Sequence, residues 1–165
     1  MIPLFLGLTA FNLLCLITTT CMGYALAGSG HASSTHLMLG VMTTMACIGV
    51  HCVVFTYFIA TAKWVQHAVT LKSLSQEWVE PTRSFKLQAF PAALLGMGSV
   101  FLTAILGAAA DNYAVSAKLH FAAAVGAVIV NAIVAQREYA AIKRNGKLID
   151  DLLERINGPA QPTRA

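Results

Sequence analysis

The sequence predicts an all-α fold: an integral membrane, up-down four-helix bundle with a short cytoplasmic amphipathic C-terminal helix. Of the 165 residues, 57% are hydrophobic and 11% are charged, whereas about a quarter of the residues of a soluble domain are charged. Four apolar segments are each long enough to cross a hydrocarbon core of about 30 Å, which takes roughly 20 residues of helix. No segment alternates with a period of two, so the pattern is typical of helices and not of a membrane barrel.

The four spans are expected at residues 2–27, 36–63, 90–111 and 115–136. The first lacks the positively charged start and the cleavage site of a signal peptide, and its apolar run is too long for one, so we expect a retained helix. Trp64 and Trp78 frame the second loop, where interfacial aromatic residues belong. The spans and their loops are expected to form one domain, residues 1–144.

Positive charge is concentrated in the second loop and in the C-terminal tail. By the positive-inside rule both are cytoplasmic, so both termini lie inside and the predicted location is a membrane of the bacterial inner-membrane type. No basic stripe interleaved with aromatic residues indicates a nucleic-acid partner. The basic residues of these two regions are Lys63, Lys72, Arg83 and Lys86 in the loop, and Arg137, Lys143, Arg144, Lys147, Arg155 and Arg164 in the tail.

Residues 145–165 are expected to form a cytoplasmic amphipathic helix and a frayed tail. Asn145–Gly146 predicts a helix break after the fourth span. The segment that follows could lie on the membrane, dock on a partner, or pack against the protein's own loop. Residues 157–165 should be a frayed end. The apolar residues that share one face of the segment are Leu148, Ile149, Leu152, Leu153 and Ile156.

The histidines are the candidate functional residues, because an imidazole at membrane depth is costly unless something binds it. His36 and His51 share one face of the second span and lie about 22 Å apart along its axis. In an up-down bundle, His120 lies at the depth of His36, near the outer end. His51 is deeper and has no histidine at its level on another helix, and His67 lies at the cytoplasmic surface.

Haem b is the leading cofactor hypothesis, because histidine is the usual haem ligand and helical bundles supply axial ligands from facing helices. His36 and His120 could form a bis-histidine pair, and His51 could serve a second haem. One haem is better supported than two, because the fourth span has no histidine near Val134, where the second ligand would fall.

In these features, the bundle and the two histidines on one helix, the chain resembles the four-helix membrane b-type cytochromes and the haem-bearing membrane anchors of quinone-linked dehydrogenases. The resemblance implies electron transport between a quinone pool and a partner, as a subunit without catalysis of its own. The implied partners are the lipid bilayer and either other membrane subunits or further copies of the chain.

Two other functions stay open. His31, His36, His120 and Asp111 offer imidazole and carboxylate ligands for zinc, copper or iron at the outer face. Alternatively, the interior histidines form hydrogen bonds between helices, and the protein is a cofactor-free scaffold or assembly subunit of a membrane complex.

Autonomous catalysis and ion exchange are not expected from the motifs. There is no CxxC pair and no arginine within an expected span. The only acidic residue near the expected lipid zone is Asp111, at its edge, whereas a proton exchanger would place a carboxylate mid-membrane.

Overall fold

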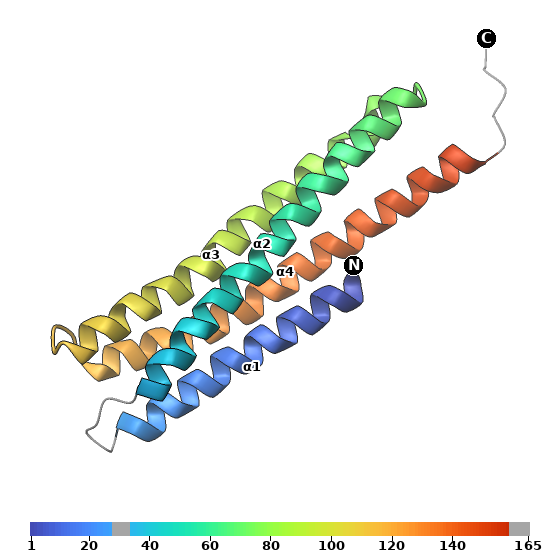
Figure 1. The fold of residues 1–165 in the computed structure, drawn as a ribbon. Coiled ribbons are helices and arrows are strands. Elements are labelled where there is room, and N and C mark those ends of the chain that lie inside the picture. Colours follow the sequence, from blue (N-terminus) through green and yellow to red (C-terminus); the bar gives the residue numbers. More distant parts are fainter. Residues whose placement is uncertain (28–33, 159–165) are drawn as a thin grey trace, which may run out of the picture.

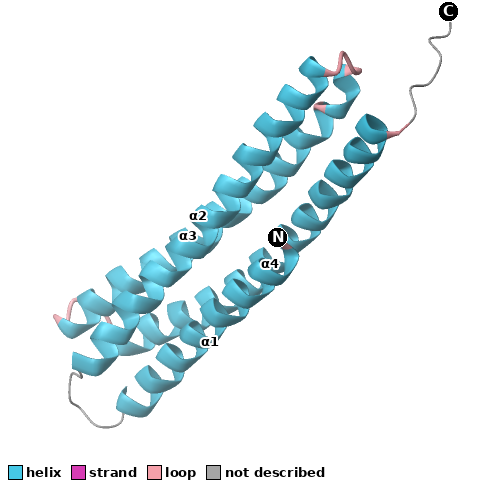
Figure 2. Ribbon diagram, turned by 45° about the vertical axis from the view of Figure 1, so that its right-hand side comes forward, coloured by secondary structure: helices cyan, strands magenta, loops and turns pink. Residues whose placement is uncertain are grey.

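The structure, a computed structural model, describes residues 1–27 and 34–158. These residues form four α-helices that run alternately up and down, as Figures 1 and 2 show, so the predicted all-α, up-down four-helix bundle is confirmed. In chain order the elements are α1 (Ile2–Ala27), α2 (Ser34–Leu71), the short 3₁₀ helix η1 (Gln76–Trp78), α3 (Glu80–Asp111) and α4 (Ala117–Asn157).

Each helix packs on the two helices that flank it in a square. The neighbouring pairs are α1–α2, α2–α3, α3–α4 and α4–α1. Helices α2 and α4 therefore face each other across one diagonal of the core, and α1 faces α3 across the other. This arrangement lets side chains of α2 and α4 meet in the middle of the bundle.

Within the described residues, four helices are long and apolar enough to cross a membrane. Their lengths differ: α1 has 26 residues and α4 has 41, which correspond to about 39 Å and about 62 Å at 1.5 Å per residue. Figure 1 shows that α2, α3 and α4 continue past the start of α1. We call this extended end, residues 63–88 and 137–158, the basic end, and the opposite end, around the α3–α4 turn at residues 111–117, the turn end.

The helices at the basic end extend beyond the membrane spans that the sequence predicted. Helix α2 continues to Leu71 and α3 begins at Glu80, whereas the spans were expected to end at residue 63 and to begin at residue 90. The reason is tertiary packing, since Val65 and Val69 are fully buried against the last turns of α4. A helix that has a packing partner does not need lipid to continue.

The predicted helix break at Asn145–Gly146 is wrong, because α4 runs without interruption to Asn157. Asn145 is buried, and its Nδ2 donates a hydrogen bond to Thr61 Oγ1 of α2 at 3.0 Å. Leu152 is also fully buried, in the cluster of Val65 and Val69. The amphipathic segment is thus the end of α4, and it packs against the end of α2 and against Leu74 and Trp78 of the second loop. Of the three alternatives, this corresponds to packing against the protein's own loop. The expected frayed end lies outside the described residues from residue 159 onward.

Two apolar layers in the core bracket the region where the polar side chains gather. One layer is nearer the turn end and the other is nearer the basic end. Each layer contains described residues from all four helices. The buried members are Leu16, Cys47, Val100 and Ala127 in the turn-end layer, and Phe5, Val54, Phe58, Phe85, Ala89, Ala141 and Ile142 in the basic-end layer.

Candidate functional site

His36 and His120 meet inside the turn end of the bundle. His36 comes from the first turn of α2 and His120 from the first turn of α4. Their ring centroids are 6.2 Å apart, and the ring planes are inclined by 74°. The sequence expectation that these two residues lie at the same depth is therefore confirmed.

Each ring of this histidine pair lies against a glycine of a neighbouring helix. A Cβ atom added to Gly23 of α1 would lie 3.0 Å from His36 Cε1, and one added to Gly107 of α3 would lie 2.9 Å from His120 Cε1. Real Cβ atoms essentially never approach as closely as the contact at Gly107, and the contact at Gly23 is tighter than most, so the two glycines provide the space that the imidazoles occupy.

The backbone sets the orientation of His120. Its Nδ1 is 3.1 Å from the carbonyl oxygen of Thr103. A carbonyl oxygen can only accept, so Nδ1 carries the proton and donates, and the lone pair of the neutral ring is on Nε2. Metal-ligating histidines commonly use their second nitrogen in this way, because the contact fixes both the tautomer and the ring orientation.

An apolar groove of about 400 Å³ lies between α1 and α4 toward the turn end, and neither His36 nor His120 lines it. Tyr24 of α1 and Phe121 of α4 contribute rings 5.5 Å apart. The groove is within the range of about 300–1,000 Å³ that cofactor and ligand sites span. Its lining residues are Thr20, Cys21, Tyr24, Phe121 and Val125.

The alternative metal site is not assembled by the residues that the structure describes. Among residues 1–27 and 34–158, no three His, Cys, Asp or Glu side chains lie close enough together to hold a metal ion. His36, His120 and Asp111 therefore do not form a three-ligand group. The fourth predicted ligand, His31, lies outside the described residues.

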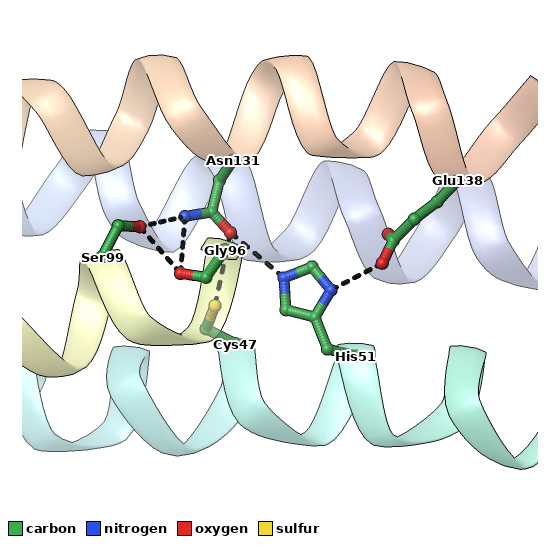
Figure 3. Close-up of polar contacts among 6 residues, drawn as sticks. All are labelled: Cys47, His51, Gly96, Ser99, Asn131 and Glu138. Atoms are coloured by element: carbon green, nitrogen blue, oxygen red, sulfur yellow. Dashed lines mark hydrogen bonds and ion pairs between the residues drawn. The ribbon is translucent and has the colours of Figure 1, made fainter. Parts of the chain in front are cut away.

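A second polar site, shown in Figure 3, lies deeper in the bundle and centres on His51 of α2. Nδ1 of His51 is 2.8 Å from Oε1 of Glu138, and Nε2 is 3.3 Å from Oδ1 of Asn131. Both partners belong to α4, across the diagonal of the square. Both ring nitrogens thus have protein partners, and an iron ligated by His51 would have to displace one of them.

The amide of Asn131 is held in one orientation. Its Nδ2 donates to the carbonyl oxygen of Ala127 at 2.9 Å and to Ser99 Oγ at 3.2 Å, and it approaches the carbonyl oxygen of Gly96 at 3.4 Å. Cys47 Sγ donates to the Oδ1 atom at 3.4 Å. Because the NH₂ group of Asn131 is directed at acceptors on α3 and α4, its amide oxygen is the atom that faces His51.

These contacts determine where the protons of the site lie. Nε2 of His51 faces an amide oxygen, so it carries a hydrogen and donates. The 2.8 Å contact between Nδ1 and Oε1 of Glu138 requires one further proton between them. That shared proton makes the His51–Glu138 pair electrically neutral as a unit.

The pair is sealed from solvent and tightly packed. The exposed fractions are 3% for His51, 1% for Glu138 and 2% for Asn131. A Cβ atom added to Gly96 would lie 2.6 Å from His51 Nε2, so α3 approaches the imidazole as closely as a glycine permits. Asn12 of α1 is buried as well, and its Oδ1 has no hydrogen-bond partner among the described residues.

Glu138 is the residue that the sequence analysis missed. The fourth span was expected to end at residue 136, and Asp111 was taken as the only acidic residue near the lipid zone. The structure shows that Glu138, two residues beyond that expected end, is buried in the bundle. The available signal was a spacing of seven residues on α4, which repeats on one face of a packed helix. Asn131, Glu138, Asn145 and Leu152 follow it, and all four are buried.

No protein-family model, curated protein or solved structure matches this chain in comparisons of its sequence and fold.

Proposed function

We propose that the protein is an integral membrane b-type haem protein that relays electrons, as a quinone-linked subunit of a larger membrane complex. The observation that carries the proposal is the pair of facing imidazoles, His36 and His120, with ring centroids 6.2 Å apart. Bonds from imidazole nitrogen to a metal are about 2 Å long, so two rings on opposite sides of one metal ion have centroids roughly 6 Å apart.

The surroundings of the pair suit a flat, apolar macrocycle. Gly23 and Gly107 let the two imidazoles pack closely against α1 and α3, the Thr103 carbonyl directs the lone pair of His120 onto Nε2, and the groove with Tyr24 and Phe121 offers apolar surface. A bound haem would supply one-electron chemistry. The chain's own part would be to hold the iron through His36 and His120.

One haem is proposed and not two. The ring nitrogens of His51 contact Glu138 and Asn131, and α4 offers no second histidine at that depth. His67 is exposed on α2 toward the basic end and is not proposed as a ligand.

The bilayer is proposed as the surroundings of all four helices, with the basic end in the cytoplasm. Lys and Arg residues cluster at that end, as the positive-inside rule requires of a cytoplasmic face. Large apolar side chains point away from the core on every helix, where lipid would cover them. Examples with about half or more of their surface exposed are Leu6, Phe11, Leu14, Met38, Met42, Leu94, Leu102 and Ile129.

Optical spectra of the protein purified in detergent from haem-replete cells test the proposal. We expect a Soret band and a low-spin reduced-minus-oxidised spectrum, with about one haem per chain by pyridine haemochrome assay. His36→Ala and His120→Ala should each abolish the low-spin signal, because each removes one of the two imidazoles that would hold the iron.

His67→Ala is the matched control, since it removes an exposed histidine from the same helix as His36. Its spectrum should equal that of the wild type. Purified protein without any haem, or an unchanged spectrum in both ligand variants, would show that the proposal is wrong.

A further inference from the structure

We infer that His51 and Glu138 form a proton-binding site inside the bundle, which takes up a proton when an electron reaches the haem held by His36 and His120. This inference rests on the proposed function. It assigns a role to the second polar site, whose residues take no part in the proposed haem binding. The site would bind a proton that arrives from the basic end.

The proton balance of the step follows from the contacts. In one state Glu138 is a carboxylate and His51 is neutral, with its single hydrogen on Nδ1 donated to Oε1, so the pair carries one negative charge. In the other state Nε2 also carries a hydrogen and donates it to Oδ1 of Asn131, and the pair is neutral. Uptake therefore forms one N–H or O–H bond and breaks none within the protein.

The groups that face the pair leave its charge uncompensated. Cys47 on α2 and Glu138 on α4 are the titratable groups that interact with His51. From α3 the described contacts are Gly96 and Ser99, which carry no charge, and α1 contains no Asp, Glu, Lys, Arg or His. Arg137 precedes Glu138 but is exposed. The protonation of the pair thus responds to a charge that appears elsewhere in the apolar core.

The size of that response follows from the distance. His51 lies about 22 Å along α2 from His36 at 1.5 Å per residue. One unit charge at that distance, at an effective dielectric constant of about 20, changes the proton affinity of the pair about three- to four-fold. Oxidised haem iron adds one positive charge relative to reduced, so the pair binds its proton more tightly after reduction.

The basic end is the nearer source of the proton. Along α4, the next buried polar residue on that side is Asn145, bonded to Thr61 and about 10 Å from Glu138 at 1.5 Å per residue. The basic-end layer, including Phe58 and Ile142, lies between these two levels. The haem pair, by comparison, is about twice as far away on the other side.

Redox titrations of the haem in liposomes between pH 5 and pH 11 test the inference. The wild-type midpoint potential should fall with rising pH between two plateaus about 30 mV apart, which is the three- to four-fold affinity change converted at 59 mV per factor of ten. Glu138→Gln keeps the size of the side chain and removes the charge, so its potential should match the wild type at acid pH and lie about 30 mV above it at alkaline pH.

Glu154→Gln is the matched control, because it makes the same substitution at an exposed position of the same helix; its curve should equal the wild type. Equal curves for wild type and Glu138→Gln, with the haem spectrum intact, overturn the proton site and leave the haem assignment standing. Absence of the haem spectrum overturns both.

If Glu138→Gln does not fold, the wild type alone decides the question. Reduction of the haem in weakly buffered solution should take up about 0.3 proton per haem near the midpoint of the titration, as a three- to four-fold change in affinity requires. A pH-indicator dye measures that uptake. Uptake indistinguishable from zero across the whole pH range overturns the inference.

Discussion

At the scale of single residues, the most regular feature of the bundle is that three histidine rings each pack against a glycine of a neighbouring helix. A membrane interior offers little hydrophobic force between helices, so close packing through small residues has to hold them together. An imidazole that replaces the missing side chain of a facing glycine combines such close packing with a polar contact. The three pairs are His36 with Gly23, His51 with Gly96, and His120 with Gly107.

Gly96→Ala tests this histidine–glycine packing at the deeper site, where His51 contacts Gly96. The new methyl group would lie 2.6 Å from His51 Nε2, and overpacking of this kind costs about 1–3 kcal/mol. We expect a lower midpoint of thermal unfolding in detergent. The control is Gly98→Ala, where no described atom of another helix lies within 4 Å of the added methyl group. Equal midpoints of thermal unfolding for the two variants would contradict the close packing of His51 against Gly96.

At the scale of the element, α4 explains both the candidate site and the error in its predicted boundary. Asn131, Glu138 and Asn145 recur every seven residues on its buried face, and each bonds to a residue of α2 or α3. Polar residues at core positions of packed helices fix the register of their neighbours. The helix therefore continues past the expected membrane boundary because its buried face still has partners there.

Gly146→Ala measures whether α4 is continuous. Within the helix, alanine is favoured over glycine by about 0.5–1 kcal/mol, and no described atom lies within 4 Å of the added methyl group. We expect thermal unfolding at a higher temperature than in the wild type. A destabilised variant would show that this position needs the backbone freedom of glycine, as a helix break would.

At the scale of the whole molecule, the two ends have different chemical character. The turn end holds the facing histidines, and the basic end holds a three-helix extension whose surface is rich in Lys and Arg. The polar levels between them are separated by the two apolar layers. Packed side chains thus separate the histidine pair, where we propose the electron carrier, from the His51–Glu138 pair, where we propose the proton site.

Cysteine labelling of whole cells tests the proposed orientation. In a chain without its four native cysteines, Tyr113→Cys at the turn end, where the side chain is 96% exposed, should react with a membrane-impermeant thiol reagent. Glu154→Cys at the basic end should react only after the cells are permeabilised, because the positive-inside rule places that end in the cytoplasm. The reverse pattern of labelling would contradict this orientation.

The sequence by itself determined the four apolar helices, their up-down order and the common depth of His36 and His120. These features depend on local properties, namely the length of an apolar run, the positions of the turns and the rise of a helix per residue. The break predicted at Asn145–Gly146 is wrong because Asn145 is buried and bonded to Thr61 of α2, a contact that no local pattern shows.

Only the tertiary structure decided that Glu138 is buried and that His51 is its partner. The two residues are 87 positions apart in the chain, and nothing in the charged segment around Arg137 and Lys143 indicates that one of its carboxylates points inward. A carboxylate is tolerated in an apolar core only where a specific donor meets it. That donor is set by the diagonal arrangement of α2 and α4, which no local pattern in the sequence contains.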